Sequence, residues 1–537
     1  MATGYAESGD ARGTILGHPK GLFVLFFAEM WERFSYYGMR ALLIFYLTKH
    51  WLYSDEQSGI IYGAYTALVY ITPVIGGYLA DRYLGQRKAV AYGAVLLTLG
   101  HFFMAFEGQA AVGHTNNPMI NVFWLALSLI IVGSGFLKAN ISVIVGQLYP
   151  RTDVRRDGAY TIFYMGINLG AALGSVLCGY IGETYGWAYG FGLAGIGMLL
   201  GLAVFTWGKP LLLGRGEPSR PLSKSTEWGL YAAGFGLVAI CWVLIQNQAM
   251  VGWLLGVFGG LLVAYVIFTA VTKLAPEDRD RIFAALFLII TSIVFWALFE
   301  QAGSSLNLFT DRHVDRAGVP ASTFQSINAI YIILLAPVFA TLWTVLGRKG
   351  LEPSAPFKFG LGVVQVGLGF LVLVWGAKSV GIDVPTPVIF IFLIYLLHTT
   401  GELCLSPVGL SAMNRLAPAH MASLIMGTWF FASATGNFAA GLIAAATGGE
   451  GVGEEAGKQV VLDVYSTVGW VAIGVGLVVL LISPLIKRLM HLDTLRDDTV
   501  DDDLAGQHEI GEPQAAGVHP AADHPAGTMY PTDEPRR

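Results

Sequence analysis

Long apolar runs alternate with short polar segments along most of this chain. In a helix, about 20 apolar residues at a rise of about 1.5 Å each cross the roughly 30 Å hydrocarbon core of a bilayer. The pattern therefore indicates an all-α polytopic membrane protein. It predicts fourteen spanning helices, at residues 22–48, 57–80, 89–107, 119–146, 159–182, 188–208, 228–246, 252–272, 282–301, 324–347, 357–377, 386–414, 421–447 and 464–487.

The composition agrees with this fold class. Of the 537 residues, 54% are hydrophobic and 13% are charged, whereas soluble domains carry about 25% charged residues. The chain also has 67 glycines, and glycine is more frequent in membrane helices than in soluble ones. Cys178, Cys241 and Cys404 lie inside apolar runs without paired spacing. The sequence therefore indicates neither a disulfide framework nor a metal site.

Basic residues are concentrated in every second loop. Counted from a cytoplasmic N terminus, the opposite side carries only Lys49, Arg312, Arg316, Lys378 and Lys458. Short loops rich in Lys and Arg stay in the cytoplasm, so both termini are expected there. Residues 1–20 are polar and lack the apolar core of a signal peptide, and the first helix is the expected membrane anchor.

A degenerate repeat divides the chain. The loop after the second run reads Leu84-Gly85-Gln86-Arg87-Lys88, and Leu346-Gly347-Arg348-Lys349 follows a later run. We predict two six-helix halves, whose interface would hold a substrate site near the membrane midplane. The predicted division is a cytoplasmic N-terminal segment, a first bundle, a linker with an inserted two-helix transmembrane hairpin, a second bundle and a disordered cytoplasmic tail, at residues 1–20, 21–208, 209–281, 282–490 and 491–537.

The first apolar run carries charge near its middle. Glu29, Glu32, Arg33 and Arg40, together with Tyr37, follow at steps of three and four and form one stripe on a helix. An ionised side chain at the centre of a membrane helix costs roughly 2.5 to 3.5 kcal/mol on the mildest scale, so the stripe must face protein or water. Glu29 and Arg33 are spaced to neutralise each other, which leaves Glu32 and Arg40 without local partners. We therefore favour a functional pathway over a purely structural ion pair.

Further polar residues lie inside later runs. Lys138 and Asn168 belong to the predicted first half, and Glu300 and Glu402 to the second. The depth of Lys138 argues against a side chain that reaches the headgroups. For Asn168, a structural hydrogen bond to a neighbouring helix is as consistent with the sequence as a functional role. The position of Glu300 is also consistent with an acid at the membrane interface. Cations on one side and acids on the other would match a small zwitterion, such as an amino acid or a short peptide.

Taken in order, these motifs resemble those of the proton-dependent oligopeptide transporters of the major facilitator superfamily, in their bacterial form. The resemblance implies the major facilitator fold and import of di- and tripeptides with protons by alternating access, across the inner (plasma) membrane of a bacterium. It spans residues 20–490 and rests on Glu29-x-x-Glu32-Arg33-Phe34-x-Tyr36-Tyr37-Gly38, Lys138-Ala139-Asn140-Ile141-Ser142, Phe163-Tyr164-Met165-Gly166-Ile167-Asn168-Leu169-Gly170, Phe299-Glu300-Gln301-x-Gly303-Ser304-Ser305 and Gly401-Glu402-Leu403.

The resemblance also implies roles for individual residues. Proton coupling is expected of Glu29, Glu32, Arg33, Lys138 and Glu300. Substrate binding is expected of Arg33, Tyr37, Arg40, Tyr70, Lys138, Asn168, Trp296, Glu300, Asn328, Glu402, Trp429 and Ser433. The expected partners are peptides, protons and membrane lipid, without nucleic acid. A monomer is expected, with no cofactor beyond the coupling proton.

Other functions stay open at this point. A carrier of nitrate or another small anion would tolerate the basic first half, although Glu300 and Glu402 would repel an anion. A peptide sensor would need an output domain, and the polar tail is a poor candidate for one. An enzyme is not expected, because the sequence has no HExxH, GxSxG or Cys/His cluster.

Overall fold

The computed structural model describes residues 13–106, 117–150, 153, 155–218, 222–448 and 457–492. Most of the predicted N-terminal segment and all but two residues of the predicted tail lie outside these ranges. The described part contains fourteen helices of 19 to 32 residues and a shorter α10. They are α1 Lys20–Phe45, α2 Asp55–Leu79, α3 Gln86–Met104, α4 Ile120–Gln147, α5 Arg155–Tyr185, α6 Trp187–Trp207, α7 Lys224–Gln246, α8 Gln248–Lys273, α9 Pro276–Phe299, α10 Ser305–His313, α11 Ser326–Arg348, α12 Ala355–Val380, α13 Ile389–Leu416, α14 Ala422–Ala446 and α15 Lys458–Leu489.

The remaining elements are short. Strands β1 Thr14–Ile15 and β2 His18–Pro19 pair antiparallel, and β3 Val314–Asp315 and β4 Thr386–Pro387 pair in parallel. Two 3₁₀ helices, η5 Glu300–Gly303 and η6 Ala321–Gln325, flank α10. They bring the chain from the end of α9 to the start of α11.

Twelve helical segments in the described part are long and apolar enough to cross a membrane. Helices α1 and α3 are outside that group. Glu29, Glu32 and Arg33 occupy the middle of α1, and α3 has Arg87 and Lys88 in its first turn. Each predicted span nevertheless corresponds to one long helix, and the prediction of an all-α polytopic membrane protein is confirmed. The domain limits stay a prediction.

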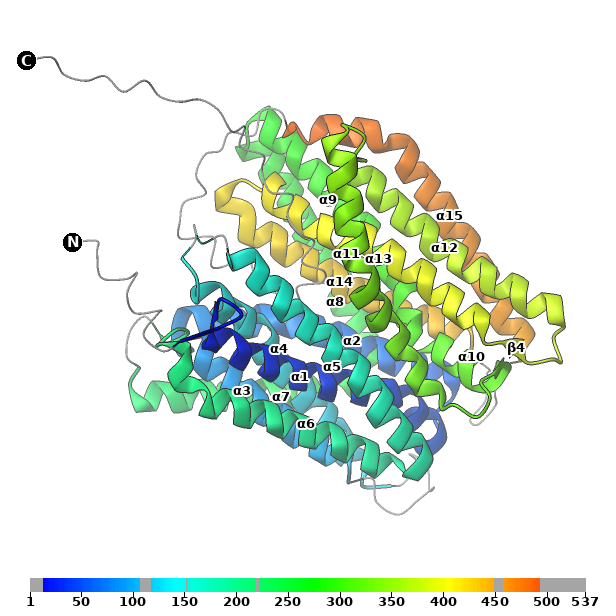
Figure 1. Ribbon diagram of the computed structural model, residues 1–537, viewed down its shortest axis with the longest axis horizontal. Coiled ribbons are helices and arrows are strands. Elements are labelled where there is room, and N and C mark those ends of the chain that lie inside the picture. The colour runs from blue at the N-terminus through cyan, green and yellow to red at the C-terminus, as the bar shows by residue number, and fades with distance from the viewer. Residues whose placement is uncertain are drawn as a thin grey trace, which may run out of the picture.

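Two groups of helices lie side by side in Figure 1. Helices α1 to α6 form the first half, coloured blue to teal, and α9 to α15 form the second half, coloured green to orange. The first half has a core that includes Leu43 and Ile130, and the second a core that includes Leu288 and Val363. Because most sides of these helices are apolar, packing contacts rather than an amphipathic pattern decide which face points inward.

Glycines allow α5 to approach the backbone of α1. A Cβ atom on Gly170 would lie 2.1 Å from the Met30 carbonyl oxygen, and one on Gly174 would lie 2.2 Å from that of Phe34. Small residues permit this close packing where lipid provides no hydrophobic driving force between helices. The contact reaches the charged part of α1 at Arg33, whose Cβ atom would lie 3.0 Å from a Cβ on Gly170.

The two arms of the inserted hairpin attach to different halves. On α7, Glu227 pairs with Lys88 of the first half at 2.7 Å, and the Tyr92 hydroxyl donates to the Tyr231 carbonyl oxygen at 2.9 Å. On α8, Gly252 lies directly against the Phe438 ring of α14, in the second half. The hairpin therefore connects the halves physically as well as along the chain.

The glycine contact predicts a difference between two equivalent substitutions. Gly170→Ala should lower the thermal unfolding midpoint in detergent, because overpacking costs about 1–3 kcal/mol. Gly192→Ala in α6 is the control, since nothing lies within 4 Å of the added methyl group. Alanine also has the higher helix propensity, so this control should be neutral or slightly stabilising. Equal midpoints for the two variants would contradict the packing argument.

Candidate functional site

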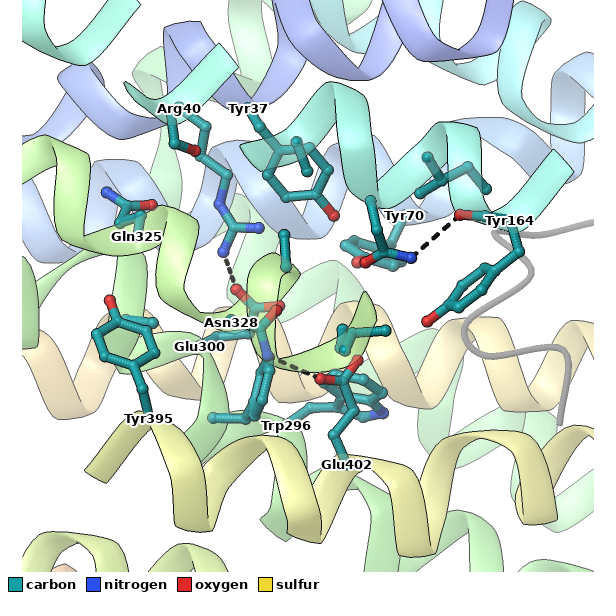
Figure 2. Close-up of a pocket in the computed structure, with 18 residues that line it drawn as sticks. Tyr37, Arg40, Tyr70, Tyr164, Trp296, Glu300, Gln325, Asn328, Tyr395 and Glu402 are labelled. Atoms are coloured by element: carbon teal, nitrogen blue, oxygen red, sulfur yellow. Dashed lines mark hydrogen bonds and ion pairs between the residues drawn. The ribbon is translucent and has the colours of Figure 1, made fainter. Parts of the chain in front are cut away.

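A cavity of about 80 Å³ lies between the two halves (Figure 2). Its wall in the first half comes from α1, α2 and α5, and its wall in the second half from α9, η5, η6, α11 and α13. Tyrosine and asparagine side chains alternate with apolar ones, and three charged residues reach the space. The lining residues are Tyr37, Arg40, Tyr70, Tyr164, Ile167, Asn168, Ala171, Ser175, Trp296, Phe299, Glu300, Ala302, Gln325, Asn328, Ala329, Ile332, Tyr395 and Glu402.

Arg40 crosses from the first half to the second. Its guanidinium Nε donates to the Tyr62 hydroxyl at 2.6 Å, and its Nη2 forms an ion pair with Glu300. Figure 2 shows the guanidinium and this carboxylate pointing toward one another across the cavity. Glu300 is placed there because α9 ends at Phe299 and the chain turns into η5. Glu300 is 4% exposed and lies inside the protein, which argues against the alternative of an acid at the membrane interface.

Glu402 forms a second polar group on the wall of the second half. Its Oε2 accepts a hydrogen bond from Asn328 Nδ2 at 3.0 Å, and the same amide donates to Thr399 Oγ1 at 3.0 Å. Glu402 and Trp296 both line the cavity (Figure 2). Helices α11 and α13 thus hold one carboxylate at the cavity, separate from the Arg40–Glu300 pair.

The hydrogen bond of Asn168 lies within its own helix, not between neighbouring helices as one interpretation of its sequence had it. Its Nδ2 donates to the Tyr164 carbonyl oxygen, one turn earlier on α5, at 3.1 Å. It also lines the cavity, together with Tyr37 and Tyr70 of the first half. The amide therefore has a structural bond and a position from which it can meet a ligand.

The charged cluster of α1 lies behind the cavity wall. Arg33 Nε is 2.7 Å from Glu29 Oε1 and 3.1 Å from Glu32 Oε2, and the three side chains are at most 1% exposed. Lys138 Nζ of α4 lies 4.1 Å from the centre of the Tyr36 ring and 5.6 Å from that of Tyr70. Because Tyr70 lines the cavity, Lys138 lies close to a residue of the cavity wall without belonging to the lining itself.

Most of the residues with an expected binding role meet at this cavity. Eight of them line it: Tyr37, Arg40, Tyr70, Asn168, Trp296, Glu300, Asn328 and Glu402. Arg33, Lys138, Trp429 and Ser433 do not belong to its lining. The Trp429 ring lies 6.3 Å from that of Phe359, and Ser433 Oγ donates to the Trp429 carbonyl oxygen at 3.2 Å. The roles of all twelve stay predictions.

Several lining residues were not predicted. Tyr164 lies one turn before Asn168, and Gln325 lies one turn before Asn328, so helical spacing from a known lining residue was an available signal. Tyr395 lies two turns before Glu402 and carried a similar signal. Apolar members such as Ile167 and Ile332 are indistinguishable in the sequence from residues that face lipid.

Polar contacts between the halves close the molecule at the end where α1 ends and α2 begins, which we call the far end. Arg312 of α10 pairs with Asp55 of α2, with Nη2 2.9 Å from Oδ1. Lys49 Nζ is 2.6 Å from Asp311 Oδ2. The backbone N–H of Ser322 donates to Glu183 Oε1 at 2.7 Å. These three contacts join the two halves at the far end.

No group of three or more His, Cys, Asp or Glu residues within the described ranges is arranged to hold a metal ion. Cys178, Cys241 and Cys404 are buried free thiols. The chemistry of the cavity therefore rests on charged, amide and aromatic side chains.

Comparison with known proteins agrees with this architecture. The POT family model matches residues 87–452. "Peptide transporter YePEPT" of Yersinia enterocolitica is 38% identical over 80% of this chain and 88% of its own length. "Dipeptide and tripeptide permease B" of the same species is 32% identical over 90% of this chain and 98% of its own length.

A solved structure supports the same assignment. The crystal structure of a mutant peptide transporter POT in complex with alafosfalin superposes with a TM-score of 0.77 at 37% identity, over 89% of this chain and 97% of that one. The predicted major facilitator fold is thereby confirmed. From its matched motifs, its fold and its relatives, the chain belongs to the POT family of transporters.

Proposed function

We propose that this protein is a proton-coupled symporter that imports di- and tripeptides by alternating access. The proposal places it in the plasma membrane of a bacterium as a monomer with both termini in the cytoplasm. It uses no cofactor beyond the coupling proton and catalyses no chemical reaction. The relatives named as peptide transporters and as a dipeptide and tripeptide permease support this assignment.

One observation carries the proposal: the cavity has a cation on its first wall and two acids on its second. The carboxylate of a peptide would bind Arg40, and its ammonium group would bind Glu402 or Glu300. Hydrogen bonds between ionised groups are stronger than those between neutral groups. Asn168 and Asn328 would meet the peptide bond. A small anion such as nitrate fits this site poorly, because Glu300 and Glu402 would repel it.

The Arg40–Glu300 pair makes proton and peptide binding interdependent. While both groups are ionised, Arg40 is neutralised by Glu300 within the buried site. A proton on Glu300 would remove that partner and leave the guanidinium able to bind the peptide carboxylate. Proton and peptide would then stabilise the same arrangement of the two halves, as coupled transport requires.

The α1 cluster would supply a second proton site. Glu29 and Glu32 share one guanidinium, and like-charged carboxylates in one field do not titrate independently. A proton on either would shift the balance of the cluster toward positive charge, with Lys138 near the ring of Tyr70. The positive charge behind the cavity wall would then attract an anionic group of the ligand into the cavity.

Alternating access requires the far end to open and close. The contacts Asp55–Arg312 and Lys49–Asp311 keep it closed in this structure. A peptide arriving from that side would reach Arg40 only after these contacts separate. Their energy would be offset by contacts that form at the opposite end of the molecule.

Uptake into proteoliposomes tests the proposal directly. We expect purified protein to accumulate labelled dialanine above its outside concentration when an inward proton gradient is imposed. A protonophore should abolish the accumulation, while the labelled peptide should still equilibrate across the membrane. Absence of uptake by protein that unfolds cooperatively in the same lipid would refute the peptide assignment.

Glu402→Gln should weaken binding of the peptide's ammonium group. A charge-assisted hydrogen bond contributes about 1.5–3 kcal/mol, so KM for dialanine should rise roughly 10- to 100-fold. N-acetyl-dialanine has no ammonium group, and its weaker inhibition of uptake should be unchanged by the substitution. Glu277→Gln, at a residue whose side chain is 57% exposed, is the matched control. An equal effect of Glu402→Gln on both ligands would argue against a direct contact.

Glu32→Gln should separate proton flow from peptide movement. The amide keeps the shape of the side chain but cannot carry the coupling proton. We expect proton-driven accumulation of dialanine to be lost, while exchange of labelled for unlabelled dialanine continues. Glu277→Gln again serves as the control. Accumulation at the wild-type level in the Glu32→Gln variant would exclude this residue from coupling.

A further inference from the structure

Gly303 leaves a space that a side chain of the other half occupies. It is the last residue of η5, directly after Glu300, Gln301 and Ala302, and it is buried. A Cβ atom built on it would lie 1.9 Å from the Tyr62 hydroxyl oxygen and 2.7 Å from Tyr62 Cζ. The hydroxyl of Tyr62 therefore fills the position that any larger residue would need for its own side chain.

The seated hydroxyl also orients Arg40. Tyr62 belongs to α2 and is 2% exposed, and its oxygen accepts the hydrogen bond from Arg40 Nε at 2.6 Å. The same guanidinium pairs with Glu300 through its Nη2. The position of the Tyr62 oxygen thus decides where the Arg40 guanidinium lies relative to Glu300.

The contact exists only between closed halves. Tyr62 and Arg40 belong to the first half, whereas Gly303 and Glu300 belong to the second. When the far end opens, η5 and α2 must separate and the Tyr62 hydroxyl must leave its seat. The fit at Gly303 therefore stabilises the closed arrangement selectively and contributes nothing to the open one.

The backbone at Gly303 does not itself require glycine. Its φ is outside the left-handed range, and η5 is a regular 3₁₀ turn. Alanine is able to adopt this conformation without strain, so the cost of a methyl group here would be steric. The ring of Tyr62 is rigid and packed in the core, and it has little room to move aside.

We propose that Gly303 is a positioning residue of the transport site. The space beside its Cα accommodates the Tyr62 hydroxyl as the far end closes. This contact positions the Arg40 guanidinium against the Glu300 carboxylate. The inference rests on the proposed transport cycle, in which the halves alternate between two arrangements. It makes Gly303, which touches no substrate, a determinant of how often Arg40 is correctly oriented.

The distance across the far end measures this effect without any substrate. Spin labels would be attached to cysteines at Glu56 and Val319, which are both exposed and belong to different halves. The three native cysteines are buried and would be replaced by alanine. Pulsed electron paramagnetic resonance then gives the ratio of long to short distances in protein reconstituted without peptide.

Gly303→Ala should raise that ratio by about five-fold or more, because overpacking would destabilise only the closed arrangement. Gly427→Ala on α14 is the matched control, since nothing lies within 4 Å of its added methyl group. The control should leave the ratio unchanged. An unchanged ratio in Gly303→Ala would overturn the proposal.

Removal of the Tyr62 ring provides the second arm of the test. In a Tyr62→Ala background, the added methyl group at position 303 no longer clashes with the Tyr62 hydroxyl. Gly303→Ala should therefore have no further effect on the ratio of long to short distances. If it still raises the ratio there, the methyl group acts through another contact and the proposal is wrong. These distances do not depend on which solute is carried, so a failed peptide-uptake assay would leave this result interpretable.

Discussion

The cost of placing ionised side chains within the hydrocarbon core constrains the whole molecule. Helix α1 carries Glu29, Glu32 and Arg33 at a depth where lipid cannot solvate them, and all three are almost completely buried. Burial of this kind requires a partner helix without bulky side chains at the contact. Gly170 and Gly174 of α5 meet that requirement by approaching the α1 backbone. Because Gly170 lies against Met30 and Arg33, this close approach contributes to the burial of the charged part of α1.

The same constraint explains why the two halves meet at the cavity. Arg40 reaches from the first half to Glu300 of the second, which balances its charge. Neither group could remain ionised and buried without the other, or without a ligand that replaces it. In the proposed transport cycle, this ion pair would both hold the two halves together and bind the substrate. Transport would use the exchange of one partner for another at this position.

The inserted hairpin adds a mechanical element to this arrangement. Its first arm is held to the first half by Glu227 and Lys88, and its second arm lies on the second half through Gly252 and Phe438. The first contact is polar, whereas the second is a close fit of an aromatic ring against a glycine, so the two arms are attached by different kinds of interaction.

The sequence by itself determined that this is a helical membrane protein, how many long helices it has and which charged residues are unsuited to contact with lipid. Hydropathy is a local property of the sequence, and so is the cost of burying a charge at Glu29, Arg40, Lys138 or Glu402. Both can be inferred without knowledge of the fold. Only the tertiary structure decided which of these residues share a space. It placed Arg40 at the cavity and Lys138 behind its wall, because helix rotation depends on contacts with neighbouring helices. The seat of the Tyr62 hydroxyl at Gly303 was equally inaccessible from the sequence, since it joins residues far apart along the chain through the fit of two surfaces.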